Sequence, residues 1–114
     1  MKINSKEVGD ICILEIEGEV DAEHSVHLKK AIVKAREDYA KNFILDLSRV
    51  SFIDSTGLGV LISLMRYLNE KGGRLKLAGL QEEVRSIFEI TRLYKVFDLS
   101  PNAEAALRDM PKKK

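Results

Sequence analysis

The feature that most constrains the fold is a regular alternation between short apolar runs and longer segments with helical spacing. Strand-like runs at 43–47, 74–80 and 95–99 are followed by helical segments at 54–70, 81–91 and 100–110, respectively. Before them, two strand-like pieces meet at Gly9-Asp10, which suits a β-hairpin, and a helical segment covers 21–40. Strands separated by helices pair in parallel. The sequence therefore predicts a single α/β domain, with a mixed sheet of four or five strands packed with four helices.

Polar residues at the starts of two helical segments predict where those helices begin. Asp21 stands where an N-cap is expected, and Glu23 would then lie in the first turn, at the favourable end of the helix dipole. Ser100 is expected to cap the last helix, with Pro101 at its first position.

Size and charge exclude several classes of protein. The chain has 114 residues, enough for one domain with its own core, and 19 basic against 18 acidic residues give a net charge of +1. Neither a nucleic-acid partner nor a membrane is therefore expected. The single cysteine, Cys12, fits a reducing compartment, and no signal segment or membrane-length apolar run is present, so we expect a soluble, cytoplasmic protein. The domain is expected over 1–110, followed by a basic tail at 111–114.

The sequence Asp-Ser-Thr-Gly-Leu-Gly at 54–59 stands where a strand gives way to a helix. Ser55 is in the position of an N-cap that accepts from the first-turn amides, so Ser55→Ala is expected to cost about 1 kcal/mol. A cap alone leaves Gly57 and Gly59 unexplained, because each glycine costs a helix about 1 kcal/mol relative to alanine. Side-chain-free positions in a first turn expose backbone N–H groups to an anion or to a protein surface, which is the alternative to a purely capping role.

Enzymatic and metal-binding interpretations of this turn have little support. The Gly-Lys-Ser/Thr of a P-loop is absent, Ile53 stands where a nucleophile elbow needs glycine, and His24 and His27 come without a cysteine cluster. No catalytic residue, metal ligand or cofactor is therefore assigned.

The helix after the turn is apolar over more than one face. Its expected core stripe comprises Leu58, Leu61, Ile62, Met65 and Leu68. Val60 and Leu64 widen the apolar arc, which fits either a deeply buried helix or an exposed apolar rim made for a partner.

The segment LDLSRVSFIDSTGLGVLISLMRYL resembles the signature of STAS domains, and specifically that of the bacterial anti-sigma factor antagonists. EGEVD resembles the end of their second strand, and the resemblance continues through KGGRLKLAGL and IFEITRLYKVF over nearly the whole chain. It implies a non-enzymatic protein that, when unphosphorylated, binds an anti-sigma factor that is also a serine kinase and so frees a sigma factor. A separate phosphatase, of the PP2C-like kind, resets it.

The resemblance also assigns roles to residues. Ser55 matches the phosphorylated serine, with Thr56 as a second hydroxyl, and Asp21 and Asp54 match aspartates at the partner surface. The remaining residues of the turn expected to contact the partner are Gly57, Leu58 and Gly59. If the strand that ends at Asp21 lies beside the Ser55 turn, both carboxylates should lie near the acceptor hydroxyl. The alternative is a STAS scaffold or accessory subunit, as in a lipid-transport or stressosome-like assembly.

Overall fold

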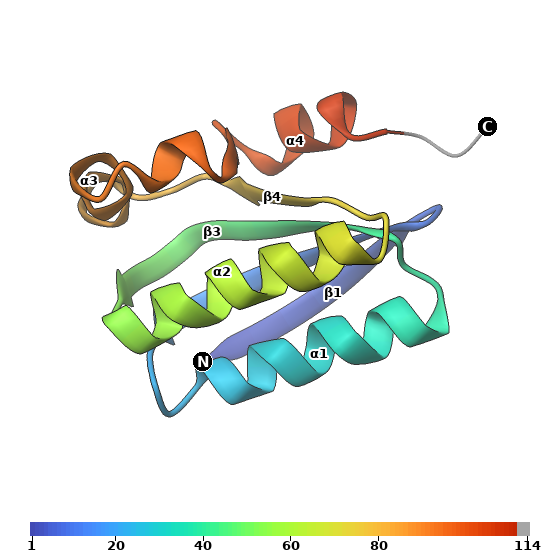
Figure 1. Ribbon diagram of the computed structural model, residues 1–114, viewed down its shortest axis with the longest axis horizontal. Coiled ribbons are helices and arrows are strands. Elements are labelled where there is room, and N and C mark those ends of the chain that lie inside the picture. The colour runs from blue at the N-terminus through green and yellow to red at the C-terminus, as the bar shows by residue number, and fades with distance from the viewer. Residues whose placement is uncertain (112–114) are drawn as a thin grey trace.

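The computed structural model describes residues 1–111, which form one five-stranded sheet packed with four α-helices (Figure 1). The elements are β1 (Lys2–Val8), β2 (Ile11–Val20), α1 (Ser25–Asp38), β3 (Asn42–Ile53), α2 (Ser55–Glu70), β4 (Leu75–Ala78), α3 (Glu82–Ile90), β5 (Asp98–Ser100) and α4 (Ala103–Asp109). The strands lie in sequence order; β1 is antiparallel to β2, and β2 to β5 are parallel. The predicted α/β class and mixed sheet are confirmed.

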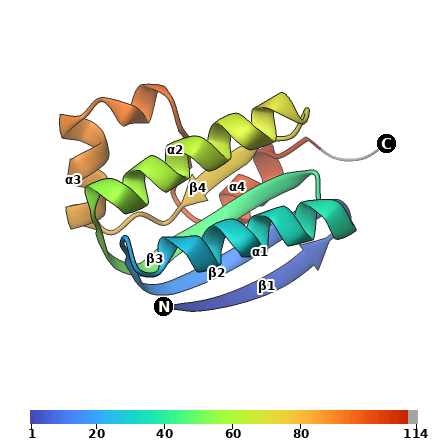
Figure 2. The ribbon, with the colours of Figure 1, turned by 60° about the horizontal axis from the view of Figure 1, so that its bottom comes forward.

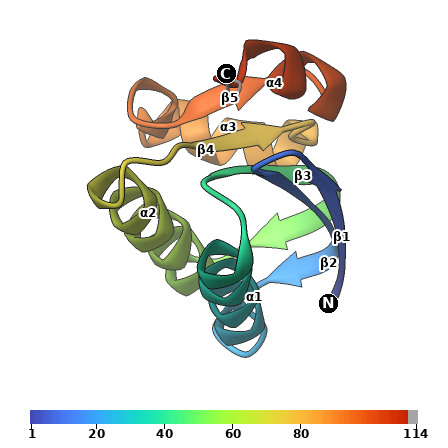
Figure 3. The ribbon, with the colours of Figure 1, turned by 90° about the vertical axis from the view of Figure 1, so that its right-hand side faces the viewer.

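Strands β2 and β3 each contain a continuous buried apolar run, Ile11–Leu14 and Phe43–Leu45, because both faces of the sheet are covered. Helices α1 and α2 lie side by side on one face, and α4 lies across the other (Figures 1 and 3). Cys12, Leu14 and Ile16 of β2 belong to the large core on the α1 and α2 side, whereas Ile11 and Ile13 pack in the smaller cluster with α4. Such continuous apolar runs are typical of parallel strands buried on both sides.

Helix α2 is buried along a different line from the predicted one. Leu61, Leu64 and Leu68 are its fully buried large side chains, so Leu64 is central to the core rather than an extension of the apolar arc. Val60 and Ile62 are partly buried against the same core cluster. The helix therefore fits the deeply buried alternative, and the wide apolar arc reflects packing inside a small domain.

Two strands have boundaries that differ from the prediction. Strand β3 runs to Ile53 instead of ending at residue 47, because it stays paired with β2 through two register shifts. The last strand is Asp98–Ser100 instead of 95–99, since Leu93–Lys95 forms a short 3-10 helix and Val96 is exposed. In both places the pairing partner, and not the local apolar pattern, sets where the strand lies.

The predicted cap of the last helix is also wrong. Ser100 is a buried residue of β5, and the side chain of Asn102 accepts from the backbone N–H of Ala105 at 2.8 Å to cap α4. Pro101 therefore precedes the helix. Asparagine and serine are similarly good N-caps, so the choice between them depends on where β5 ends.

Within residues 1–111, no helix has the length and apolar character needed to cross a membrane. Of the basic tail predicted at 111–114, only Pro111 is described, and it is exposed. The charged part of that tail lies outside the described residues.

Candidate functional site

The first turns of α1 and α2 lie at the same end of the sheet (Figure 2). They meet there because β2 and β3 are parallel neighbours, with Val20 paired to Ile53 at their carboxyl ends. The backbone N–H of Asp54 donates to the carbonyl of Val20 at 3.3 Å, which joins the two turns directly. The expectation that the strand ending near Asp21 lies beside the Ser55 turn is confirmed.

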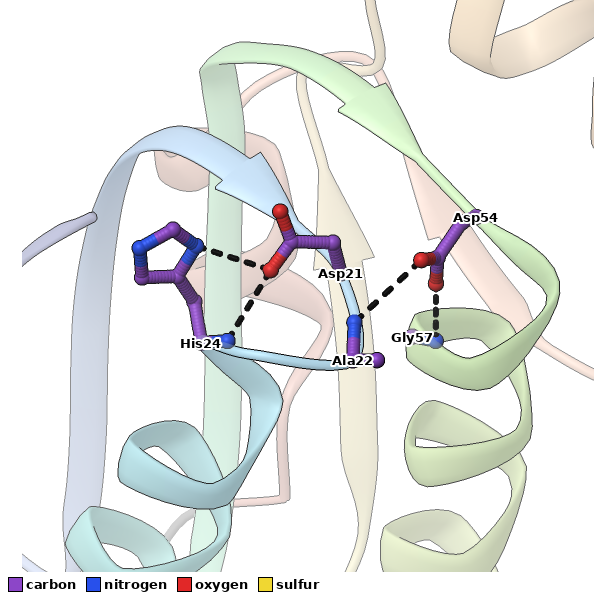
Figure 4. Close-up of polar contacts among 5 residues, drawn as sticks. All are labelled: Asp21, Ala22, His24, Asp54 and Gly57. Atoms are coloured by element: carbon purple, nitrogen blue, oxygen red, sulfur yellow. Dashed lines mark hydrogen bonds and ion pairs between the residues drawn. The ribbon is translucent and has the colours of Figure 1, made fainter.

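Asp54, not Ser55, is the N-cap of α2. Its Oδ1 accepts from the backbone N–H of Gly57 at 2.7 Å, and its Oδ2 accepts from the backbone N–H of Ala22 at 3.2 Å (Figure 4). One carboxylate thus caps a helix and ties that helix to the turn after β2. The predicted cap was wrong by one residue because Asp54 is still in extended conformation, and aspartate caps as well as serine does.

Ser55 and Thr56 are the first two residues of α2, and both are exposed, as predicted for Ser55. Within the described part of the chain, neither hydroxyl takes part in a hydrogen bond. The backbone N–H groups at the start of a helix have no intrahelical acceptor, and the helix dipole makes this end favourable for negative charge. A group added to either hydroxyl would project into solvent at that end.

The presence of glycine has a different structural explanation at each of the two positions in this turn. A Cβ on Gly57 would overlap the carbonyl oxygen of Val20, so glycine allows the first turn of α2 to lie directly against the end of β2. A Cβ on Gly59 would meet nothing within 4 Å. Gly57 is therefore explained by internal packing, and only Gly59 matches the idea of a position left open on the surface.

Asp21 is not the N-cap of α1, which begins at Ser25 with His24 in the cap position. Oδ1 of Asp21 accepts from the backbone N–H of His24 at 2.9 Å and lies 2.8 Å from Nδ1 of the same histidine (Figure 4). The backbone N–H of Ser25 donates to the carbonyl of Asp21 at 2.9 Å. Asp21 therefore closes the turn ahead of the helix, and Glu23 lies in that turn rather than in the first helical turn.

The contacts with His24 stabilise the charged form of the Asp21 carboxyl. The hydrogen bond from the His24 backbone N–H is the largest cause, and it holds the pKa of Asp21 below its ordinary value, opposed by partial burial. The side-chain contact with the imidazole acts in the same direction. Asp21 is thus a carboxylate over a wide range of pH.

His24 is the residue that sequence reasoning missed. The sequence offers it only as a base or a metal ligand, whereas the observed contact depends on an aspartate oxygen accepting from the backbone N–H three residues on, as at a helix start. Figure 4 shows its ring on the side of Asp21 away from α2, so the ring does not face the Ser55 turn. Among the described residues, no group of three or more His, Cys, Asp or Glu side chains could hold a metal ion.

The site brings most of the expected residues together, but not all face outward. Asp54 and Thr56 flank Ser55 in the chain, and Asp21 follows β2 at the end that β2 shares with β3. That both carboxylates lie near the Ser55 hydroxyl stays a prediction. Leu58 is partly buried and packs against the core cluster, so only part of its side chain is available on the surface. A further exposed side chain, Phe52, lies two residues before Asp54 and is 47% exposed.

Comparison with known proteins identifies the family. A family model described as the STAS domain matches residues 2–106. The anti-sigma-B factor antagonist of Bacillus subtilis (strain 168) is 34% identical over 95 residues, which are 83% of this chain and 86% of that protein. Both the domain and a named relative thus span most of the chain.

Solved structures of anti-sigma factor antagonists share the fold of this chain. The crystal structure of an anti-sigma factor antagonist from Mycobacterium paratuberculosis is similar with a TM-score of 0.84 and 25% sequence identity, over 96% of this chain and 92% of that one. The Bacillus protein SpoIIAA shares the fold in its unphosphorylated and phosphorylated forms, with TM-scores of 0.72 and 0.73 and identities of 21% and 22%, over 94% of this chain and 96% and 97% of those chains. The chain therefore belongs to the STAS domain family, and its curated relatives are named anti-sigma factor antagonists.

Proposed function

We propose that this protein is an anti-sigma factor antagonist whose binding is switched off by phosphorylation of Ser55. The observation that carries the proposal is the exposed Ser55 hydroxyl at the first residue of α2, on a turn that Asp54 and Gly57 fix against β2. The unphosphorylated protein binds an anti-sigma factor, and the sigma factor held by that partner is released. The named relatives support this assignment.

The surface near Ser55 has features expected of a site where a partner protein docks while the Ser55 hydroxyl is unphosphorylated. Phe52, near the end of β3, supplies an exposed aromatic side chain on the face of the sheet opposite Ile53, and aromatic residues are enriched at the centres of protein interfaces. Thr56 and Gly59 are exposed and uncharged. A partner that covers this end of α2 also meets the Asp54 carboxylate, but both oxygens of that carboxylate already accept backbone hydrogen bonds.

A phosphate on Ser55 changes that surface without unfolding the helix. It adds about −1.5 to −2 charges and three acceptor oxygens. At the helix N-terminus this charge is favourable, because the first N–H groups of α2 lack intrahelical partners. Beside Asp54, however, it places like charges inside the interface, and burying them under a partner is unfavourable. The partner is therefore released while the domain stays folded.

The protein is the substrate of the phosphoryl transfer and not the enzyme. The resemblance implies that the anti-sigma factor is itself a serine kinase, which brings nucleotide, metal and catalytic base, and that a PP2C-like phosphatase removes the phosphate. Asp21 and Asp54 then contribute to recognition; Asp54 also has a structural role as cap and clamp. Such a system operates in the cytoplasm, where sigma factors act.

The proposal is tested by purifying the protein from cells that naturally produce it. We expect mass spectrometry to find an anti-sigma factor with a kinase domain in complex with the unphosphorylated protein, and phosphate on Ser55 in the unbound fraction. Thr56→Ala should still be phosphorylated, whereas Ser55→Ala should not. A stable assembly that contains phosphorylated and unphosphorylated protein equally would contradict the switch and favour the scaffold alternative.

A further inference from the structure

We propose that His24 is a positioning residue for partner recognition: its imidazole fixes the Asp21 carboxylate so that one oxygen stays free for the anti-sigma factor. This inference rests on the proposed function, because it concerns the surface that receives that partner. It assigns the two aspartates of the site different tasks.

The two carboxylates differ in how many of their oxygens the fold uses. Both oxygens of Asp54 accept backbone N–H groups, from Gly57 and Ala22. The two hydrogen bonds from His24 to Asp21, in contrast, both go to the same oxygen, Oδ1, and the backbone N–H of Glu23 makes only the smallest contribution to stabilising this carboxylate. Figure 4 shows the second oxygen of Asp21 pointing away from His24 without a contact to the residues drawn. Asp21 is thus the aspartate with an acceptor to offer to a partner.

The imidazole of His24 restricts the rotation of the Asp21 carboxylate, which the backbone hydrogen bonds alone do not. The turn is already closed by the backbone N–H of His24 on Oδ1 and by the Ser25 N–H on the Asp21 carbonyl. A single hydrogen bond to Oδ1 leaves the carboxylate free to rotate about that contact, whereas a second donor at 2.8 Å restricts the rotation. The ring is therefore unnecessary for closing the turn but orients the second oxygen. Restricting a recognition group before binding reduces the entropy lost on association.

The protonation pattern of the pair follows from the chemistry of the carboxylate. An ionised carboxylate only accepts hydrogen bonds, so Nδ1 of His24 must carry the hydrogen. The side chains of His24 and Asp21 are 30% and 19% exposed, so the pair lies at the surface where a partner can reach it. A charge-assisted hydrogen bond in a partly covered position is stronger than a neutral one.

Two substitutions of His24 distinguish the loss of its hydrogen bond to Asp21 from the loss of its ring. In His24→Asn the amide nitrogen stands near the place of Nδ1 and can still donate to Asp21, whereas in His24→Gln the amide lies one bond further out. His27→Gln is the matched control, because His27 lies three residues further on, in the first turn of α1, and is exposed. Thermal melts of all three proteins report any loss of folding.

The first measurement needs no partner. Carbon-13 NMR follows the titration of the Asp21 carboxyl, whose pKa the contacts with His24 lower. We expect the Asp21 pKa to rise in His24→Gln, to rise less in His24→Asn, which keeps a donor but loses the charge of the imidazole, and to stay near the parent value in His27→Gln. An unchanged Asp21 titration in His24→Gln would overturn the orienting role.

The second measurement is affinity for the anti-sigma factor that co-purifies with the parent protein. We expect His24→Gln to bind about tenfold more weakly at an unchanged melting temperature, and His24→Asn to bind within about twofold of the parent. Equal affinity of His24→Gln and the parent would overturn the inference, as would a loss in both variants that follows their thermal stability. If the parent captures no anti-sigma factor, the proposed function fails and the recognition role falls with it; the Asp21 titration then distinguishes that failure from a failure of the local geometry.

Discussion

The two ends of α2 are held by the same kind of contact but differ in what they leave exposed. A Cβ on Gly57, in the first turn, would overlap the carbonyl oxygen of Val20, and a Cβ on Gly73, just beyond the last turn, would overlap that of Lys41. In both places glycine lets the helix end lie against backbone at the end of a strand, since Val20 is the last residue of β2 and Lys41 directly precedes β3. The requirement is steric and is the same at the two ends.

The two ends of α2 differ in how their polar groups are hydrogen-bonded. At the carboxyl end, the backbone N–H groups of Lys71, Gly72 and Gly73 satisfy the last carbonyls of the helix, so the end is closed by its own chain. At the amino end, Asp54 closes part of the turn, and the hydroxyls of Ser55 and Thr56 stay exposed. Gly57 and Gly73 are therefore explained by packing, whereas the proposed function depends on the hydroxyl of Ser55, which precedes Gly57.

The largest effect on stability is expected from filling either close approach. Gly57→Ala and Gly73→Ala should each lower the free energy of unfolding by about 3 kcal/mol, because the new methyl group overlaps backbone that cannot rotate away. Urea denaturation followed by circular dichroism measures both. A loss below about 1 kcal/mol for one variant only would show that the two ends are not held in the same way.

A smaller loss is expected from removing the clamp that only the amino end has. Asp54→Ala removes the cap on Gly57 and the bond to Ala22, which should cost about 2 kcal/mol. Asp54→Asn keeps one acceptor for Gly57 but turns an amide N–H toward the N–H of Ala22, so its loss should be intermediate. The same denaturation experiment ranks the variants, and equal losses for the two would mean that the bond to Gly57, which only the asparagine keeps, contributes nothing.

Gly59→Ala is the matched control for Gly57→Ala within the same turn of sequence. A Cβ here meets nothing within 4 Å, so the gain in helix propensity should raise the free energy of unfolding by about 1 kcal/mol. If Gly59 lies against the partner, as we propose, the more stable variant should nevertheless bind the anti-sigma factor more weakly. Thermal melts and pull-downs measure the two effects, and a destabilised Gly59→Ala would contradict the open position.

The smallest effect is a change in acid stability from Asp21. Its pKa is lowered in the folded protein from the ordinary value of 3.8, so its contribution to stability is present above pH 3.8 and is lost as the pH falls through the lower folded value. The stability difference between the parent and Asp21→Asn should therefore shrink below pH 3.8. Denaturation midpoints between pH 7 and pH 3 test this, and a difference that grows toward low pH would have the wrong sign.

The comparison of the two ends also shows how far the sequence could be interpreted. The alternation of apolar runs and helical segments was enough for the α/β fold, and the strand-to-helix position of Ser55 was enough to place its hydroxyl on the surface. The N-cap was misplaced because Asp54 and Ser55 are both good caps, and the choice depends on Ala22, which lies 32 residues away. Short-range sequence patterns contain no information about a contact between residues so far apart in the chain.

Other errors have the same origin. Gly57 was interpreted as an open surface position, whereas its reason is the carbonyl of Val20 on another strand. Ser100 was expected to cap a helix but is used in the ladder of β5 against β4. Whether Ser55, Asp21 and the glycines contact a partner stays a prediction.

The central claim is that charge at Ser55, and not the stability of its helix, controls binding. Because Asp54 is the cap, Ser55→Ala should leave the melting temperature close to that of the parent, contrary to the loss of about 1 kcal/mol expected from the sequence. Ser55→Asp should also stay folded, since a negative charge suits the first turn of α2. The deciding measurement is the affinity of both variants for the co-purified anti-sigma factor: the account predicts that Ser55→Ala binds like the parent and that Ser55→Asp binds at least tenfold more weakly. Equal binding by a well-folded Ser55→Asp and the parent would contradict it.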